Sequence, residues 1–289
     1  MRAYLKTALV LIAGVPIDQS RSGLEDMAYV ELGRITSTDA GGLSDAGAIG
    51  LIPTGALEQH GPHLPMLMDS VHAEALARAV ADTLPVLTVV TPCITPGLSE
   101  HHMDFPGTVT LSPETFRGVV LAYVEALERL AIDQIAIFSG HGGNFSAIGQ
   151  IAREVSAERR TTVIAFDDLS RFVNVMVEAG RQAGIDPPET DFHAGLLETS
   201  VALMLFDESA VRPFAGVDGY TAAEPGWLER VMTEGLKAVS ENGVLGSPGA
   251  ATAEAGQRIF DALVEELATW IAQAFALDLQ SAVHDASIS

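Results

Sequence analysis

Residues 48–69 read AIGLIPTGALEQHGPHLPMLMD, and they pass from an apolar run into a polar loop. Ala48–Pro53 has the short, continuous hydrophobicity of a buried strand, and the loop Thr54–Asp69 is rich in glycine, proline and histidine. The chain repeats this arrangement further on, where the apolar run Gln134–Phe138 opens into the glycine- and histidine-rich loop Ser139–Asn144. Each strand leads through its loop to a helical pattern, which is typical of α/β folds.

Amphipathic helices alternate with the apolar runs along the chain. Ser70–Thr83 has helical spacing with Ser70 as a candidate cap, and Ser112–Leu130 has Ser112 as its cap and Pro113 at its first position. Further helices are predicted at Phe145–Arg159, Glu198–Leu205, Trp227–Val239 and Thr252–Phe275, and further strands at Val86–Pro92 and Thr162–Phe166. This order predicts one α/β domain over residues 27–280, with a mainly parallel sheet flanked by helices on both faces. Ligands of such sheets bind at the carboxyl ends of the strands, where both histidine-rich loops fall.

The composition excludes several classes of protein. The chain has 289 residues, of which 48% are hydrophobic, so it can bury a large core and is not disordered as a whole. With 38 acidic against 16 basic residues, the net charge is −22, and such a chain repels nucleic acid and anionic membranes. A single cysteine, Cys93, excludes an intramolecular disulfide and fits a reducing compartment, so we expect a cytoplasmic protein.

Residues 1–26 form a separate segment at the start of the chain. Basic residues precede the apolar run Ala8–Val15, which has the outline of a secretory signal but is too short to span a bilayer as a helix. No clear small-x-small cleavage site precedes Asp18, and Met27 is an alternative start. We expect a leader or an upstream extension without regular structure. A true signal peptide would instead direct the protein to the periplasm or out of the cell.

The loop after the first strand carries a candidate metal site. In extended backbone Glu58 and His60 project to the same side, and Asp69 can return from the far end of the loop. Mixed histidine and carboxylate ligands suit zinc, manganese or iron, and the absence of thiolates argues against a structural zinc site. A lone loop histidine is usually solvated or hydrogen-bonded, so His63 and His72 keep that alternative. The grouping of the other residues favours metal binding.

Two later motifs add candidate residues. Glycines in Ser139–Asn144 let the backbone approach a bound group, which places His141 as a further ligand and Gly142 against the substrate. A phosphate-binding turn is the alternative, although no Lys or Ser/Thr follows as in a P-loop. His193 and Glu198 lie at a predicted loop-to-helix junction. Glu198 is a candidate ligand, and its alternative role is that of a first-turn carboxylate that stabilises the helix.

The stretch Ser99–Thr108 holds adjacent histidines, His101 and His102. Their side chains cannot both face one ligand in extended backbone, so we expect one of them to line the pocket, and we assign His102 to substrate binding. Cys93 has no evident base beside it and is interpreted as a buried residue rather than a nucleophile.

These motifs together resemble the creatininase family of amidohydrolases. The matching segments are residues 55–65 (GALEQHGPHLP) with Asp69, 100–108 (EHHMDFPGT), 140–144 (GHGGN), 193–200 (HAGLLETS), and 243–248 (GVLGSP) with 251–254 (ATAE). The resemblance covers residues 27–275. It implies a sandwich-like α/β fold, a centre of two divalent metal ions, and a homo-oligomer, commonly a hexamer.

The resemblance also implies roles for individual residues. Its metal positions fall on Glu58, His60, Asp69 and His141. Asp69 would bridge the cations, and His193 matches a histidine that handles protons at the scissile amide. The chain departs from creatininase proper, because Gly143 stands where that enzyme has a metal-binding glutamate, and residues 190–192 (TDF) stand where it has a Trp-Asp pair. Our hypothesis is that Glu198 supplies the missing ligand.

The expected activity is hydrolysis of a carbon–nitrogen amide bond in a cyclic amide, a formamide or a small peptide-like compound, as in a non-peptide amidohydrolase. A hydroxide shared by two divalent cations, zinc by preference and manganese or iron(II) as alternatives, would attack the carbonyl, and His193 would move a proton to the leaving nitrogen. The alternatives are hydrolysis of a non-amide bond in a small cyclic carbonyl compound, such as a lactone or keto-inositol, and a non-catalytic metal- or ligand-binding protein. The expected partners are a small-molecule substrate and further copies of the chain, with no nucleic acid and no membrane.

Overall fold

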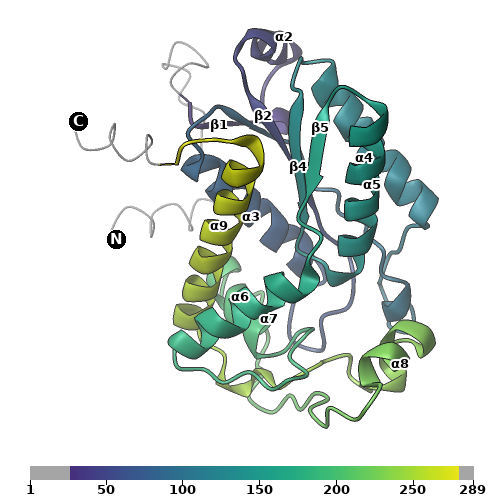
Figure 1. Ribbon diagram of the computed structural model, residues 1–289. Helices are drawn as coiled ribbons and strands as arrows, with labels where there is room; N and C mark the ends of the chain where they lie inside the picture. Colours follow the sequence, from purple (N-terminus) through teal and green to yellow (C-terminus); the bar gives the residue numbers. More distant parts are fainter. Residues whose placement is uncertain (1–26, 280–289) are drawn as a thin grey trace.

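The computed structural model describes residues 27–279, and its centre is a parallel sheet (Figure 1). The strands are β1 (Tyr29–Glu31), β2 (Ile49–Thr54), β3 (Thr88–Val90), β4 (Gln134–Ser139) and β5 (Thr162–Ala165). They lie in the order β1-β3-β2-β4-β5, and every pairing between neighbours is parallel. The predicted mainly parallel sheet is confirmed, and the expected leader of residues 1–26 lies outside the described residues.

Helices cover both faces of this sheet. They are α2 (Ser37–Gly41), α3 (Met68–Thr83), α4 (Pro113–Glu128), α5 (Phe145–Glu158), α6 (Leu169–Gln182), α7 (Leu196–Leu205), α8 (Trp227–Glu234) and α9 (Ala253–Phe275). One hydrophobic layer contains buried residues of α3, α6, α7 and α9, and the layer on the opposite face contains those of α4 and α5. This arrangement confirms the predicted α/β fold. Between residues 27 and 279, no helix has both the length and the hydrophobicity that a membrane span requires.

The sheet separates these two layers because successive side chains of a strand point to opposite faces. In β2, Leu51 contributes to the layer under α3 and α9, whereas Ile52 contributes to the layer under α4 and α5. In β4, Phe138 contributes to the layer under α3 and α9, and Ile137 contributes to the layer under α4 and α5. The central strands are therefore apolar on both faces, which is why their sequence is a continuous hydrophobic run instead of an alternating one.

The two predicted helix caps have different outcomes. Ser112 caps α4 as predicted: its hydroxyl accepts a hydrogen bond from the Thr115 N–H at 3.2 Å, and Pro113 is the first helical residue. The prediction for Ser70 is wrong, because α3 begins at Met68 and has no side-chain cap. The Ser70 hydroxyl donates instead to the main-chain oxygen of Ala56 at 2.9 Å, and so ties the helix to the end of β2.

Other differences concern the ends and number of elements. The predicted helix 227–239 ends at Glu234, because Gly235 has φ +91°, and a short 3-10 turn, Leu236–Ala238, follows it. The sequence interpretation named no element at β1 or α6. Asp168 caps α6, and its carboxylate accepts a hydrogen bond from the Arg171 N–H at 2.9 Å.

Candidate metal centre

The histidine-rich loops meet at the carboxyl ends of β2 and β4. These strands are neighbours, and their last residues, Thr54 and Ser139, are paired. The loop after β2 leads to α3 on one face of the sheet, whereas the loop after β4 leads to α5 on the other face. Connections that leave two neighbouring strands in opposite directions open a crevice at the sheet edge, which is the usual ligand site of open α/β sheets.

Close packing brings the first turn of α3 to this crevice. A Cβ atom at Gly140 would lie 2.3 Å from the main-chain oxygen of Asp69, and one at Gly55 would lie 2.5 Å from the Cα of Ser70. Only glycine at these positions lets the helix start lie directly against the ends of β4 and β2. The Asp69 carboxylate therefore lies beside the loop that carries His141.

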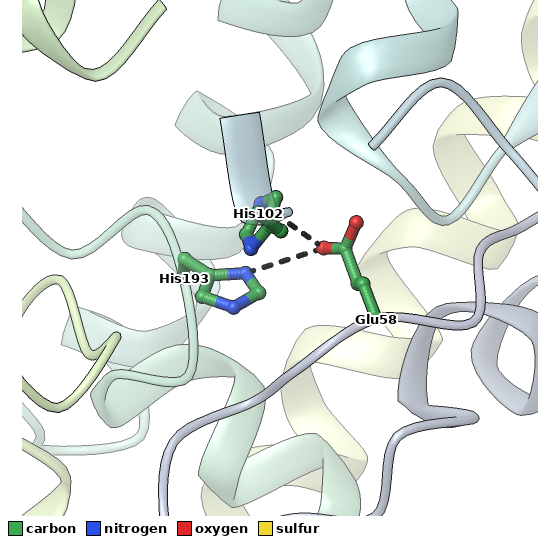
Figure 2. A group of neighbouring side chains, drawn as sticks. All are labelled: Glu58, His102 and His193. Carbon is green, nitrogen blue, oxygen red and sulfur yellow. Dashed lines mark ion pairs between the residues drawn. The ribbon is translucent and has the colours of Figure 1, made fainter. Parts of the chain in front are cut away.

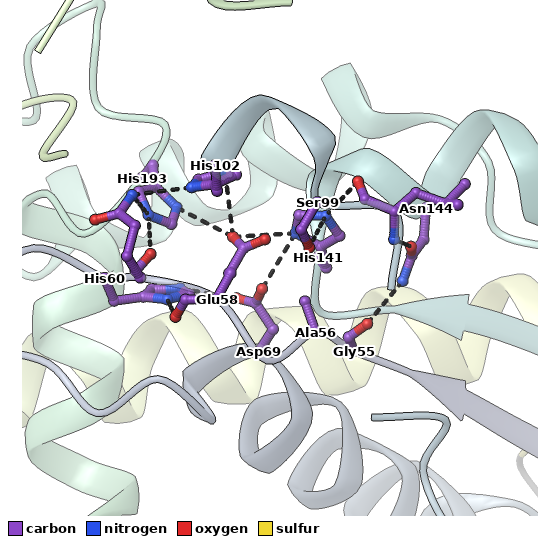
Figure 3. A network of polar contacts seen from close by, with 12 residues as sticks. Gly55, Ala56, Glu58, His60, Asp69, Ser99, His102, His141, Asn144 and His193 are labelled. Atoms are coloured by element: carbon purple, nitrogen blue, oxygen red, sulfur yellow. Dashed lines mark hydrogen bonds and ion pairs between the residues drawn. The ribbon is translucent and has the colours of Figure 1, made fainter. Parts of the chain in front are cut away.

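Histidines and carboxylates converge here from three segments of the chain (Figure 3). His60 Nε2 lies 3.0 Å from Asp69 Oδ1, and His141 Nδ1 lies 3.1 Å from Asp69 Oδ2. His141 Nδ1 is also 3.3 Å from Glu58 Oε1. The two oxygens of Asp69 thus face different histidines, which is the arrangement that a carboxylate shared between two cations requires.

The surroundings of the Glu58 carboxylate indicate whether cations fit this site. Its side chain is fully buried, and neither of its oxygens accepts a hydrogen bond from any residue between 27 and 279; the same holds for Asp69 Oδ2. Buried carboxylate oxygens without donors are costly unless a cation balances them. Imidazole nitrogens with carboxylate oxygens, and no thiolate, form a donor set suited to zinc or manganese. The residues present fit divalent cations.

Main-chain carbonyls determine which ring nitrogen of His60 and of His141 faces the carboxylates. The Nδ1–H of His60 donates to the main-chain oxygen of Glu58 at 3.2 Å, so Nε2 is the nitrogen that faces Asp69 and that would bind a cation in place of its proton. The Nε2–H of His141 donates to the main-chain oxygen of Leu98 at 3.2 Å, so Nδ1 is the nitrogen that faces the carboxylates and that would bind a cation in place of its proton. A hydrogen bond of this kind from the distal ring nitrogen is the usual support of a metal-binding histidine.

Glu198 and His193 come to the centre from the start of α7. Glu198 Oε2 accepts a hydrogen bond from the Ala194 N–H at 2.6 Å, and it lies 3.8 Å from His60 Nε2 and 4.0 Å from His193 Nδ1. One oxygen of Glu198 thus stabilises the chain before the helix and also faces the cluster, and its role as a metal ligand stays a prediction.

The glycine at position 143 has no space for a side chain. A Cβ atom there would lie 2.4 Å from the main-chain oxygen of Leu98 and 2.5 Å from His141 Nε2. A carboxylate cannot be held at this position without moving the His141 ring or the loop of Leu98. Besides Asp69, the carboxylate of Glu198 faces His60.

A second group of side chains adjoins the first (Figure 2). His102 Nε2 lies 3.4 Å from Glu58 Oε1, and His193 Nδ1 lies 3.7 Å from the same oxygen. His102 belongs to a 3-10 turn, Glu100–His102, and not to extended backbone as the sequence interpretation assumed. The turn also brings in His101, whose ring stacks on His141 with centroids 5.8 Å apart.

The structure places the remaining candidates outside this cluster. His63 hydrogen-bonds the Thr199 hydroxyl at 2.9 Å, and the buried His72 lies near Phe172 and Phe260. A Cβ atom at Gly142 would have only Leu169 within 4 Å, so a substrate contact there stays a prediction. The phosphate-binding alternative for this loop is disfavoured, because its histidine already faces two carboxylates that repel an anion.

Cys93 has the structural role that its neighbours in sequence indicate. It is buried, and burial raises the pKa of its thiol above the ordinary range, so the thiol stays protonated. A nucleophilic role would require the opposite shift.

The buried histidines and carboxylates of the cluster shift one another's pKa values. Burial lowers the pKa of His60, but Asp69, Glu198 and Glu58 more than offset this and raise it to about 10. Burial raises the pKa of Asp69, but His60 and His141 bring it well below its usual range. Burial raises the pKa of Glu198 to about 7, against the effect of His60. Protons and a bound cation would therefore compete for the same side chains.

Two polar residues beside the cluster, Asn144 and Gln59, were not predicted from the sequence. The Asn144 Nδ2 group donates to the main-chain oxygen of Gly55 at 2.9 Å, and its Oδ1 accepts from the Leu98 N–H at 3.0 Å, so it joins three loops of the centre. The Gln59 Nε2 group lies 2.9 Å from His102 Nδ1. Both residues lie inside the motifs quoted above. Their position between or beside candidate ligands is the one feature of the sequence that could have indicated their contacts with the centre.

Comparisons with known proteins identify relatives over most of this chain. The sequence profile of the family described as creatinine amidohydrolase, or creatininase, matches residues 33–271. A mycofactocin precursor peptide peptidase of Mycobacterium tuberculosis (strain CDC 1551 / Oshkosh) is 35% identical over 258 residues, which cover 84% of this chain and 92% of the relative. A creatinine amidohydrolase of Pseudomonas putida is 26% identical over 240 residues, 78% of this chain and 89% of the relative. Among solved structures, a mutant creatininase of "Zn-Zn type" has a TM-score of 0.63 at 25% identity, covering 85% of this chain and 98% of that chain.

Proposed function

The chain belongs to the creatininase family, and we propose that it is a metal-dependent hydrolase of carbon–nitrogen amide bonds whose substrate is a short peptide or a peptide-like amide. The observation that carries this proposal is the Glu58 carboxylate, which is buried among three histidines without a hydrogen-bond donor. A buried, uncompensated carboxylate is retained at a cost in stability, which a catalytic centre explains.

The substrate class follows from the relatives and from position 143. The relative at 35% identity is a peptide peptidase, whereas the creatinine amidohydrolase is 26% identical. Gly143 has no room for a carboxylate, which disfavours creatinine as the substrate. We therefore favour a peptide-type amide over the cyclic and formyl amides.

The ligands divide into two sets that share Asp69. Glu58, Asp69 and His141 would hold one divalent cation, and His60, Asp69 and Glu198 would hold the other; the structure of the "Zn-Zn type" relative supports zinc. When bound, such cations polarise a carbonyl oxygen and lower the pKa of water. The protein residues would supply the negative charge that retains the cations.

His193 is the candidate for proton transfer. Burial, and then the neighbouring His60, hold the pKa of His193 well below its usual range, so the ring is neutral and can accept a proton. Its Nδ1 lies 3.7 Å from Glu58 Oε1 and 4.0 Å from Glu198 Oε2, at the edge of the ligand sets. From this position it would pass a proton to the leaving nitrogen of the amide.

The test is an assay of the full-length protein with zinc or manganese restored, and again after chelation. Short synthetic peptides, formamides, creatinine, lactams and a lactone are incubated separately, and products are identified by mass spectrometry. We expect metal-dependent cleavage of peptides. The isosteric variant Glu58→Gln should lose this activity, whereas Glu154→Gln, which changes a surface residue paired with Arg117, should keep it.

Three outcomes would contradict the proposal. Peptide cleavage that survives both chelation and Glu58→Gln would place the activity elsewhere. Cleavage of the lactone alone would favour the non-amide alternative. A fully metal-loaded protein that cleaves none of the compounds would favour a non-catalytic binding protein.

A further inference from the structure

Gln59 lies between two candidate ligands in the sequence but contacts two other histidines. Main-chain groups fix the orientation of its side-chain amide: Oε1 accepts a hydrogen bond from the Gly61 N–H at 2.9 Å, and Nε2 donates to the main-chain oxygen of Gly243 at 3.2 Å. A rotated amide would lose both bonds, so the NH₂ group is identified without ambiguity. One hydrogen of that group remains for a further acceptor.

This remaining hydrogen determines the tautomer of His102. Gln59 Nε2 lies 2.9 Å from His102 Nδ1, and an amide NH₂ can only donate. His102 Nδ1 must therefore carry a lone pair, and in the neutral ring the hydrogen is on Nε2. That nitrogen lies 3.4 Å from Glu58 Oε1, so His102 presents an N–H to the cluster.

The main chain of the same residue determines the tautomer of His193. The Gln59 carbonyl oxygen lies 2.8 Å from His193 Nε2 and can only accept, so Nε2 carries the hydrogen. His193 Nε2 is also 3.0 Å from Gln59 Nε2, but a protonated nitrogen cannot accept that contact as a hydrogen bond. The lone pair of His193 is therefore on Nδ1, which faces Glu58 and Glu198.

We propose that Gln59 is a positioning residue that holds His102 and His193 in the same neutral tautomer, with the hydrogen on Nε2, but with opposite ring nitrogens toward the cluster: His102 presents its N–H and His193 its lone pair. This inference rests on the proposed function for its chemical meaning. An N–H at His102 Nε2 can stabilise negative charge that develops on a substrate oxygen, and a lone pair at His193 Nδ1 can take up a proton. Because His102 Nε2 carries a hydrogen, the group of Glu58, His102 and His193 does not form a further cation site.

The experiment is ¹⁵N NMR of the full-length protein labelled at the histidine ring nitrogens, recorded with zinc bound and after chelation. A ring nitrogen with a hydrogen and one with a lone pair resonate in well-separated regions, so each tautomer is observed directly. Signals are assigned with His102→Gln and His193→Gln. We expect hydrogen on Nε2 of both rings, with Nδ1 of His102 hydrogen-bonded and Nδ1 of His193 facing the cluster.

The isosteric variant Gln59→Glu separates the roles of side chain and main chain. A carboxylate cannot donate to His102 Nδ1, so the hydrogen of His102 should move from Nε2 to Nδ1, while His193 should not change because its partner is a main-chain oxygen. We expect kcat for a peptide substrate to fall by about 10²-fold with zinc content retained. Gln182→Glu, at an exposed glutamine bonded to Glu178, is the control and should alter neither tautomer.

The inference is overturned if His102 carries its hydrogen on Nδ1 in the wild-type protein, or if Gln59→Glu leaves the His102 tautomer unchanged. Should Gln59→Glu fail to fold, Gln59→Leu replaces it, and His102 should then populate both tautomers. The first of these two tests uses the wild-type spectrum, so it does not depend on the folding of any Gln59 variant. A protein that cleaves no amide would overturn the proposed function, but the tautomers would still be measured, so the two failures are distinguishable.

Discussion

Glu198 Oε2 lies 3.8 Å from Nε2 of His60, and this carboxylate comes from α7 and not from the loop after β4. The loop has no space for a side chain at Gly143. The centre therefore draws its carboxylates from the loop after β2, from the start of α3 and from the start of α7.

Glu198→Gln should remove one of the two cations. The amide keeps the size of the side chain but loses the negative charge that faces His60, so zinc content should fall by about half, with the ligands of the other cation intact. Elemental analysis of the purified variant measures this. Glu208→Gln, at an exposed glutamate just beyond α7, is the matched control. An unchanged zinc content in Glu198→Gln would show that Glu198 is not a ligand.

Gly143→Ala and Gly142→Ala, in the same 3-10 turn, should behave differently. The methyl group at position 143 would meet the Leu98 oxygen and the His141 ring within 2.5 Å, so the loop must move, at a cost of about 1–3 kcal/mol. The methyl group at position 142 would meet nothing closer than 3.8 Å. Thermal unfolding and zinc titration of both variants provide the comparison. Equal stability and zinc affinity for the two would contradict the packing at Gly143.

The pairing of the two loops could be predicted from the sequence. Both apolar runs end in histidine-rich segments, and the carboxyl ends of parallel strands lie at one edge of a sheet, so Glu58 and His141 were expected near each other. The structure brings them within 3.3 Å. The cap of α4 was also predictable, because Ser112 and Pro113 determine it locally.

Other features depend on tertiary contacts that sequence spacing does not reveal. Ser70 looked like a helix cap, but its hydroxyl bonds Ala56 and the helix starts before it. The role of Gln59 depends on His102 and His193, which come from distant segments. Nothing in the motif itself indicates that the side chain of a glutamine between two candidate ligands would hydrogen-bond to neither of them.

His72 should make the fold sensitive to acid. Burial lowers its pKa from 6.5 to about 4, although Asp69 opposes this, and its Nε2 has no hydrogen-bond partner among residues 27–279. Above pH 6.5 the ring is neutral in both the folded and the unfolded chain. As the pH falls to about 4, only the unfolded chain gains the proton, so up to about 3 kcal/mol of stability is lost.

The measurement is urea unfolding of the wild-type protein and of His72→Leu between pH 7 and pH 4. The free energy of unfolding should fall less steeply in the variant. The value for the variant minus the value for the wild-type protein should therefore increase as the pH decreases. A difference that stays constant over this range would mean that His72 titrates normally in the folded chain.

Asp69→Asn should remove both cations, unlike Glu198→Gln. Its two oxygens lie 3.0 Å from His60 Nε2 and 3.1 Å from His141 Nδ1, so the carboxylate belongs to both ligand sets. The variant replaces one oxygen with an NH₂ group and removes the charge that both cations share. We expect zinc affinity to fall by at least about 10–100-fold at both positions, and zinc content to fall toward zero at concentrations that saturate the wild-type protein. Asp261→Asn, at an exposed aspartate bonded to Gln257 on α9, is the matched control. If Asp69→Asn keeps one equivalent of zinc while Glu198→Gln also keeps one, the cations do not share Asp69, and the division of ligands proposed above is wrong.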